Sequence, residues 1–294
     1  MNDTLTPLLA LEMGLGEGPI WHPEHNALYW VDILGGALHR LDFDHNAHTV
    51  VDYGEAITCV VRHAGGGFLA AMRSGLWRLD EAGARQDRVA DAPQNPRDHR
   101  FNDGGCDPTG RFWIGTMNET LAAADAGLYC HDGAALRARL GGMTITNGLA
   151  FSTDGRWMYH TDTLTRVIRR HRYDPATGEL GAGEVWVDLN ALDIAGNPDG
   201  AAVDADDHYW TALFGGAGLA RFDPDGRLVA RYPLAALQPT MPAFGGADGR
   251  TLFVTTAREN MDAVALAEWP DSGALFSMTV DVPGRPTAAF RDNR

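Results

Sequence analysis

Oxygen-bearing side chains recur at one kind of place along this chain, where a carboxylate or an amide stands just ahead of a hydrophobic run. The pairs are Glu17-Gly18, Asn102-Asp103, Asn147-Gly148 and Asp199-Gly200. Carboxylate and amide oxygens are the ligands that hard divalent cations prefer. If Glu17, Asn147 and Asp199 lie together in the fold, they supply three oxygen ligands with two negative charges. The sequence therefore predicts a divalent-cation site.

Each of these pairs also has a simpler structural explanation, because Asn-Gly and Asp-Gly are common turn signals. A turn would account for any one pair taken alone. Their shared register favours the metal site, since three pairs stand at the same place in three separate repeats. The corresponding positions of two other repeats carry Thr58-Cys59 and Met241-Pro242.

Six copies of one short apolar strand supply the elements that would bring these side chains together. The copies begin at Tyr29, Phe68, Phe112, Trp157, His208 and Leu252. Their period of about 40 to 50 residues is typical of a four-stranded propeller blade. The sequence therefore predicts an all-β fold, a six-bladed β-propeller with four-stranded antiparallel blades around a central channel, in which residues 1–294 form a single domain.

A propeller places the first strand of every blade beside the channel, so equivalent positions of the repeats converge there. An open stack of sheets would leave unpaired edges, and the ring must therefore close. We expect Leu5 to Leu9 and Thr287 to Phe290 to share strands in the last blade. We also expect a short helix over residues 261–268, which are rich in Ala, Leu and Glu.

Charge and cysteine content narrow the partners and the compartment. The formal net charge of −15 repels nucleic acid and anionic membrane surfaces alike, so neither is an expected partner. Cys59, Cys106 and Cys130 are widely spaced, which fits a reducing compartment better than a disulfide framework. Residues 1–4 lack the basic region of a leader and the apolar stretch 5–11 is short, which predicts a soluble, cytoplasmic protein.

Two other catalytic chemistries are disfavoured by the motifs. The eleven histidines form no H-E-x-x-H, so His22, His160 and His208 are interpreted as structural and zinc with nitrogen ligands is not expected. No G-x-S-x-G is present, which argues against a serine esterase.

Four longer motifs together give the chain a resemblance to a known family. They are Leu15-Gly16-Glu17-Gly18-Pro19-Ile20-Trp21, Arg100-Phe101-Asn102-Asp103-Gly104, Thr146-Asn147-Gly148-Leu149-Ala150-Phe151-Ser152 and Pro198-Asp199-Gly200. With them the chain resembles the senescence marker protein, regucalcin and gluconolactonase family of lactone hydrolases over nearly its whole length. The resemblance implies that Glu17, Asn147 and Asp199 bind one divalent metal, that Arg100 and Asn102 face the substrate, and that Asp199 is also the general base.

The chemistry of a sugar lactone agrees with these roles. A lactone is an ester, and a cation would polarise its carbonyl and lower the pKa of the attacking water, whose proton Asp199 would accept. Arg100 would donate to ring oxygens or hydroxyls, and Asn102 can both donate and accept. Calcium, zinc, manganese and magnesium all remain possible, because oxygen ligands discriminate weakly among them. The structural alternatives are a surface salt bridge for Arg100 and an asparagine turn for Asn102.

Several alternatives stay open at this point. Asn118 and Glu119, in the loop after Gly115-Thr116-Met117, could contact the substrate, although a solvated loop carboxylate also explains Glu119. Another metal-dependent hydrolase, acting on phosphotriesters or acyl-homoserine lactones, would need an apolar pocket in place of these donors. A calcium- or sugar-binding protein without activity would use the same oxygen ligands.

Overall fold

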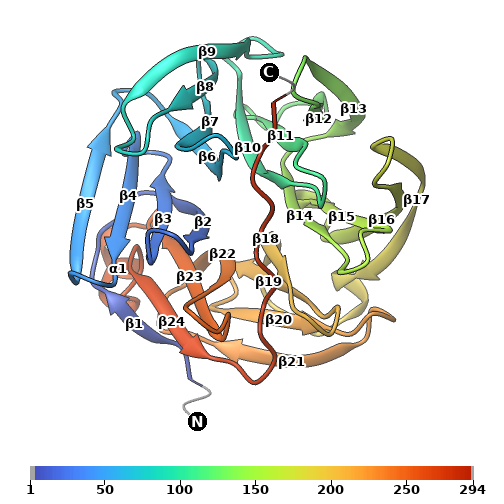
Figure 1. Cartoon of the computed structure of the whole chain (residues 1–294). Coiled ribbons are helices and arrows are strands. Elements are labelled where there is room, and N and C mark those ends of the chain that lie inside the picture. Colours follow the sequence, from blue (N-terminus) through green and yellow to red (C-terminus); the bar gives the residue numbers. More distant parts are fainter. Residues whose placement is uncertain (1–3, 293–294) are drawn as a thin grey trace.

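A computed structural model describes residues 4–292, and these residues form six four-stranded antiparallel sheets arranged as a ring (Figure 1). The predicted six-bladed β-propeller is confirmed. Residues 1–3, where the sequence analysis noted the absence of a basic leader region, lie outside the described part.

Each blade begins with its innermost strand and continues outward along the chain. Blade 1 comprises β2 (Gly16–His22), β3 (Ala27–Asp32), β4 (Ala37–Asp42) and β5 (Ala47–Asp52). Blade 2 comprises β6 (Ile57–Arg62), β7 (Phe68–Met72), β8 (Gly75–Leu79) and β9 (Arg85–Asp91). Blade 3 comprises β10 (His99–Cys106), β11 (Phe112–Asn118), β12 (Ala126–His131) and β13 (Leu136–Met143).

The second half of the ring repeats this order until the last blade. Blade 4 comprises β14 (Thr146–Phe151), β15 (Trp157–Asp162), β16 (Val167–Asp174) and β17 (Glu179–Asp188). Blade 5 comprises β18 (Asn197–Val203), β19 (Tyr209–Phe214), β20 (Gly218–Phe222) and β21 (Leu228–Pro233). Blade 6 comprises β22 (Gln238–Gly245), β23 (Thr251–Ala257), β24 (Leu275–Thr279) and β1 (Thr6–Leu9).

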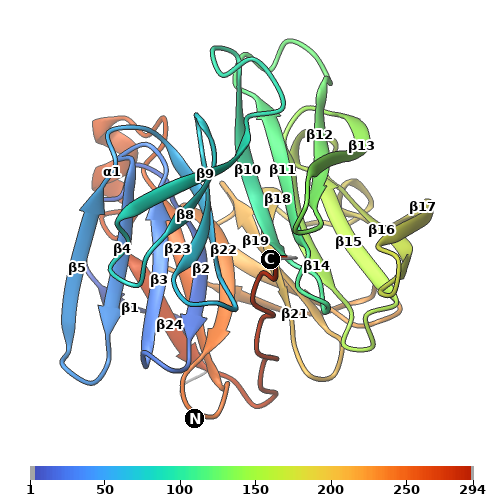
Figure 2. The same ribbon diagram turned by 45° about the horizontal axis from the view of Figure 1, so that its top comes forward.

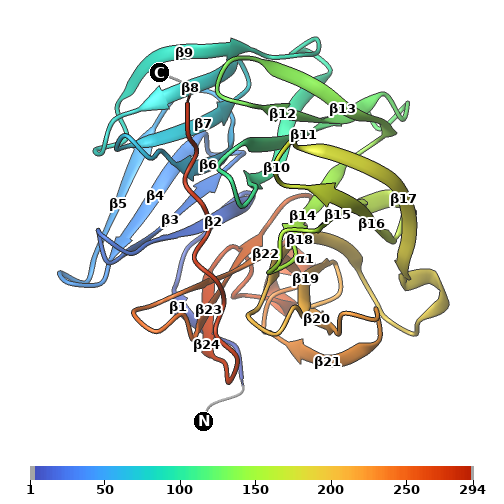
Figure 3. The ribbon, with the colours of Figure 1, turned by 45° about the vertical axis from the view of Figure 1, so that its right-hand side comes forward.

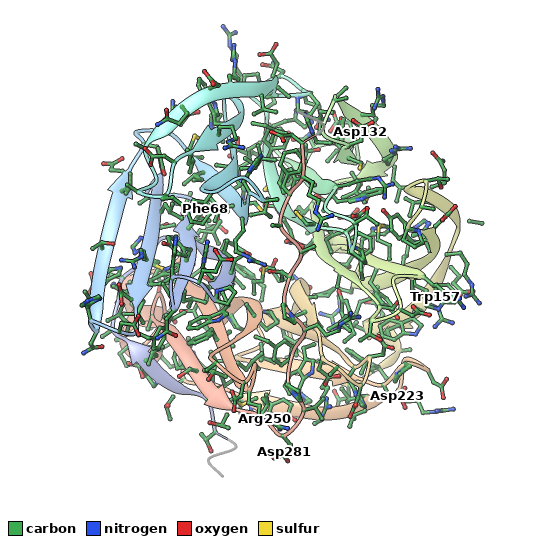
Figure 4. All side chains as sticks on the ribbon, viewed as in Figure 1. Phe68, Asp132, Trp157, Asp223, Arg250 and Asp281 are labelled. Atoms are coloured by element: carbon green, nitrogen blue, oxygen red, sulfur yellow. The ribbon has the colours of Figure 1, made fainter. Side chains whose placement is uncertain are left out.

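The apolar strands recognised in the sequence are the second strands of the blades, and they are almost wholly buried. Both faces of such a strand pack against neighbouring sheets, so its hydrophobic run is nearly continuous. Trp30, Trp113 and Trp210 lie at most 2% exposed in three of them. Phe68 lies inside the ring of sheets, whereas Trp157 and Asp223 lie toward its rim (Figure 4).

An aspartate at or just beyond the end of the third strand shapes the turn to the fourth in five blades of the described chain. Its carboxylate accepts the backbone N–H two residues further on, as Asp-initiated turns do. These aspartates are Asp42, Asp80, Asp132, Asp174 and Asp223. The repeat visible in the sequence is therefore also a repeat of turn chemistry.

The two chain ends close the molecule in different ways. The N-terminal prediction is confirmed, because β1 pairs with β24 through Thr6 and Ser277 as the outer strand of blade 6. The prediction for residues 287–290 was wrong. β1 already occupies that edge, and residues 282–292, here called the C-terminal strap, instead run across one end of the channel (Figures 1 and 3).

The strap is held by backbone pairing to several blades. Phe290 N–H donates to the carbonyl of Arg62 at 2.7 Å, and Ala64 N–H donates to the carbonyl of Phe290 at 2.8 Å. Near its start, Gly284 forms a bridge with Asp204 of blade 5. Between the strap and the inner strands lies a cavity of about 280 Å³, whose lining includes Trp21, Phe151, Phe244 and Pro286.

The ring thus has two unlike faces, which Figure 2 shows from the side. The strap covers one face, here called the strap face. The inner strands begin at the other, here called the site face, where the predicted helix appears as α1 (Ala263–Glu268) with Asp262 as its N-cap. Within the described residues no helix combines the length and apolar character needed to cross a bilayer.

Replacing Phe290 by Ala tests whether the strap is part of the folded core. Its side chain is 1% exposed, and its ring centroid lies 5.5 Å from those of His63 and His131. We expect the free energy of unfolding to fall by about 3 kcal/mol, because truncating a buried Phe leaves a cavity. Equilibrium urea unfolding measures this loss. Val229→Ala, at a position 50% exposed on β21, is the control, and an equal effect of both changes would show that the strap adds nothing to stability.

Candidate functional site

Every inner strand is irregular near its start, on the site face. The pairing register with the second strand shifts there in each blade, between Glu17 and Ile20, Ile57 and Cys59, Phe101 and Gly104, Asn147 and Ala150, Pro198 and Ala201, and Pro239 and Met241. Such bulges turn neighbouring side chains away from the regular alternation of a strand. Gly18 and Gly148 adopt φ of +54° and +65° at two of them, a backbone conformation that favours glycine.

Three carboxylates are buried at this level of the channel. Glu17, Asp103 and Asp199 are 7%, 6% and 6% exposed. Burial raises the pKa of Glu17 and of Asp199, and each is raised further by a neighbouring carboxylate, Asp103 for Glu17 and Glu17 for Asp199. The structure therefore brings Glu17 and Asp199 close enough for their charges to interact, although they belong to blades 1 and 5.

Asp103 is the most firmly held of the three. Burial raises the pKa of Asp103 to about 7, and this rise is opposed by hydrogen bonds from backbone N–H groups. Its Oδ2 accepts from Leu149 N–H at 2.8 Å. The sequence analysis named Asp103 only as the neighbour of Asn102 and assigned it no role. The aligned Asn102-Asp103 pair was the available signal for it.

Arg100 is the basic side chain whose charge interacts with the buried carboxylates Glu17 and Asp199. It is 8% exposed, its burial lowers the pKa of the guanidinium, and its charge opposes the raised pKa of both Glu17 and Asp199. A single guanidinium does not balance three buried carboxylates, and uncompensated buried charge is costly. The donor set therefore fits an oxygen-bound divalent cation, with Glu17, Asn147 and Asp199 as the side chains available to hold it.

A chain of hydrogen bonds links the proposed substrate contacts to the proposed metal ligands. Arg100 Nη1 donates to Asn102 Oδ1, and Asn102 Nδ2 donates to Asn147 Oδ1 at 2.9 Å. Asn147 Nδ2 in turn donates to Thr163 Oγ1 at 2.8 Å, and Thr163 donates to the carbonyl of Pro198 at 3.0 Å. Both amides are thereby oriented, and Arg100 is itself buried.

Glu119 lies at the edge of this group, held by an arginine that the sequence analysis did not identify. Arg73, in the turn between β7 and β8, donates from both terminal nitrogens to the Glu119 carboxylate at 2.7 and 2.8 Å. This hydrogen-bonded ion pair lowers the pKa of Glu119. Glu119 Oε1 also lies 3.6 Å from Arg100 Nε. Glu119 is thus a fixed neighbour of Arg100, and no motif in the sequence pointed to Arg73.

The other positions named from the sequence form hydrogen bonds within their own blades and loops. Asn118 Oδ1 accepts from Thr120 N–H at 2.9 Å and so shapes its own loop. Thr58 Oγ1 donates to the carbonyl of Ala71 at 3.3 Å. In blade 6 the irregular position is Thr240 rather than Met241-Pro242, and its hydroxyl oxygen lies 2.8 Å from Thr255 Oγ1.

Comparison with known proteins identifies the family of this chain. Residues 15–258 match the model of the SMP-30/Gluconolactonase/LRE-like region. The chain is 41% identical to a 6-deoxy-6-sulfogluconolactonase of Pseudomonas putida over 97% of each chain. It is 36% identical to the pentonolactonase XacC of Haloferax volcanii, covering 96% of this chain and 97% of the relative.

Among solved structures, a regucalcin of Agrobacterium tumefaciens, described as a calcium-binding protein, is similar throughout. It superposes with a TM-score of 0.90 at 32% identity, covering 97% of this chain and 95% of that one. The similarities in sequence, in three-dimensional structure and in overall length therefore all point to the same family. The chain belongs to the SMP-30/gluconolactonase/LRE-like family.

Proposed function

We propose that this protein hydrolyses sugar lactones to aldonic acids, with Asp199 as general base and with Glu17, Asn147 and Asp199 holding one divalent cation. The observation that carries the proposal is the group of three buried carboxylates beside the buried Arg100–Asn102 pair at one end of the channel. Two relatives at 41% and 36% identity are named as lactonases of different sugar acids, which supports the substrate class.

A divalent cation bound there would supply Lewis acidity toward an ester carbonyl and toward a water molecule. Burial, followed by the charge of Glu17, raises the pKa of Asp199 in the metal-free protein. With a cation bound, Asp199 would accept the proton through the carboxylate oxygen that does not hold the ion. Asn147 is held in orientation from both ends of its amide, by Asn102 and by Thr163. The residues thus divide the work into ion binding, orientation and proton acceptance.

Arg100 and Asn102 suit a polyhydroxylated substrate. A guanidinium offers fixed donors, and an amide offers both a donor and an acceptor. A phosphotriesterase or an acyl-homoserine lactonase would call for an apolar pocket, and this end of the channel carries charged and amide groups instead. The Agrobacterium relative is described as a calcium-binding protein. Calcium binding without catalysis would use the same oxygen ligands as the proposed lactonase and would differ from it only in activity.

Metal content tests the proposed ligands. Asn147→Ala and Asp199→Ala should each lose most of the bound divalent cation, because each removes one of three oxygen ligands. Elemental analysis of the purified variants, supported by calorimetric titration with Ca²⁺ and Mn²⁺, gives the measurement. Asn190→Ala and Asp193→Ala change exposed residues of the same two types and should keep the full content. Unchanged metal in both ligand variants would contradict the proposed site.

Asp199→Asn separates ion binding from catalysis, because the amide keeps an oxygen ligand but cannot accept a proton. Hydrolysis of the best sugar lactone should nearly vanish at every pH, whereas Asp193→Asn should behave as wild type. Arg100→Ala should keep its metal, because it leaves the three proposed ligands in place and removes a positive charge that would repel the cation. It should lose about 1.5–3 kcal/mol of transition-state stabilisation, or roughly tenfold to a hundredfold in kcat/KM. Turnover by Asp199→Asn close to wild type would overturn the assignment of the base.

Arg73 should act as a positioning residue through Glu119. Arg73→Ala removes the two donors that hold the Glu119 carboxylate beside Arg100, so KM should rise by roughly threefold to tenfold while kcat changes little. Arg73→Lys keeps the charge but not the paired donors, so its KM should lie between those of wild type and Arg73→Ala. Arg97→Ala, an exposed change on the same face, is the control. Equal kinetics for Arg73→Ala and Arg97→Ala would show that Glu119 needs no such support.

A further inference from the structure

A second group of metal-ligating side chains lies on the strap face, between blades 1 and 2. His22 ends β2 and His25 lies in the following turn, whereas Glu81 lies in the turn between β8 and β9. One ligand atom from each of these side chains lies within 4.8 Å of the other two. Imidazole nitrogen together with carboxylate oxygen is a donor set typical of Zn²⁺.

We propose that His22, His25 and Glu81 form a zinc-type metal site that ties blade 1 to blade 2, distinct from the oxygen site at the opposite end of the channel. From the sequence alone, His22 was interpreted as structural and zinc with nitrogen ligands was not expected. Glu81 is far from the histidines along the chain, and only the packing of the two blades brings it to them.

His22 can offer a neutral nitrogen at little cost. It is 6% exposed, and its Nδ1 accepts the backbone N–H of His25 at 3.3 Å, so the ring is not doubly protonated. Asp107 and Asp204 occupy the same strand-end position in other blades and accept turn N–H groups at 2.8 and 3.0 Å. The hydrogen bond that His22 accepts is the longest of these three. Breaking it to bind a metal ion should therefore cost less than breaking either of the other two.

His25 and Glu81 already have the outer hydrogen bonds that orient metal ligands. His25 Nδ1 lies 2.8 Å from the hydroxyl of Tyr29, which can accept as well as donate. Glu81 Oε1 accepts from Gly67 N–H at 2.8 Å, and its Oε2 lies 3.1 Å from His25 Nε2. One nitrogen of His25 and one oxygen of Glu81 therefore face each other while their other atoms are held.

Ion binding requires one local rearrangement. The rings of His22 and His25 stack with centroids 3.6 Å apart and planes 5° apart, so their nitrogen lone pairs run parallel instead of converging. Ligand atoms around tetrahedral zinc lie roughly 3.4 Å apart, given a Zn–N distance of about 2.1 Å. His25 can turn, because its side chain is 25% exposed and borders a cavity of about 410 Å³ that Glu81 also lines. The same cavity gives the ion a route in and leaves room for a water as fourth ligand.

Binding and spectroscopy on the full chain test this site apart from the proposed active site. Zn²⁺ is titrated calorimetrically into the protein saturated with Ca²⁺, and Co²⁺ replaces Zn²⁺ to report nitrogen ligation by its visible absorption. Wild type and Asp199→Ala should both bind one Zn²⁺ on the strap face, because the substitution leaves His22, His25 and Glu81 unchanged. Bound Zn²⁺ should also raise Tm, since a ligand of the folded state stabilises it.

Glu81→Gln and His25→Ala should each weaken Zn²⁺ binding at least about tenfold and should reduce the Co²⁺ absorption and the rise in Tm. Glu81→Gln decides the matter if His25→Ala folds poorly, because Glu81 is exposed and the amide can keep the Gly67 bond. His45→Ala, an exposed histidine on the same face, is the control. Absence of this Zn²⁺ binding in wild type, or its persistence in both ligand variants, would overturn the proposal and leave the group as a hydrogen-bonded link between blades.

Discussion

Closure of the ring by β1 against β24 is the contact on which the rest of the structure depends. Blade 6 draws its outer strand from the start of the chain, so the first and last blades are tied together. At the same junction, on the inner side, Thr240 Oγ1 donates to the carbonyl of Gly16, one residue before Glu17. Because the ring is closed at its outer strands and at its inner strands, the starts of all inner strands lie around one channel. An open stack of sheets would not bring them together.

The convergence of the inner strands buries three carboxylates near one another, and these buried charges define the candidate site. Glu17, Asp103 and Asp199 come from three different blades, and burial in the channel raises the pKa of each. Backbone N–H groups stabilise Asp103, and Arg100 opposes the remaining charge. A bound cation would complete the balance, and the amides of Asn102 and Asn147 connect Arg100 of blade 3 to blade 4. The proposed metal binding and the proposed catalysis would therefore depend on the same buried carboxylates.

The strap face shows how one structural position can take on different chemistry in different blades. The residue at or just beyond the end of the inner strand accepts a turn N–H as Asp107 in blade 3 and as Asp204 in blade 5. Blades 1 and 2 use His22 and His63 instead, and each accepts through Nδ1. An imidazole there leaves a second nitrogen available, which in blade 2 lies 3.1 Å from Asp292 of the strap.

The sequence by itself determined the blade number, the position of the second and third strands and α1, because these depend on hydrophobic patterning and turn residues that repeat locally. It also indicated Glu17, Asn102, Asn147 and Asp199, since equivalent positions of a closed propeller must meet at the channel, whereas Arg100 was implied only by the family resemblance. Only the tertiary structure decided that residues 287–290 cross the ring instead of joining blade 6, that Arg73 holds Glu119, and that Glu81 meets His22 and His25. Such contacts join turns and termini of different blades, and the periodicity of a repeat carries no information about which side chains of neighbouring blades face one another.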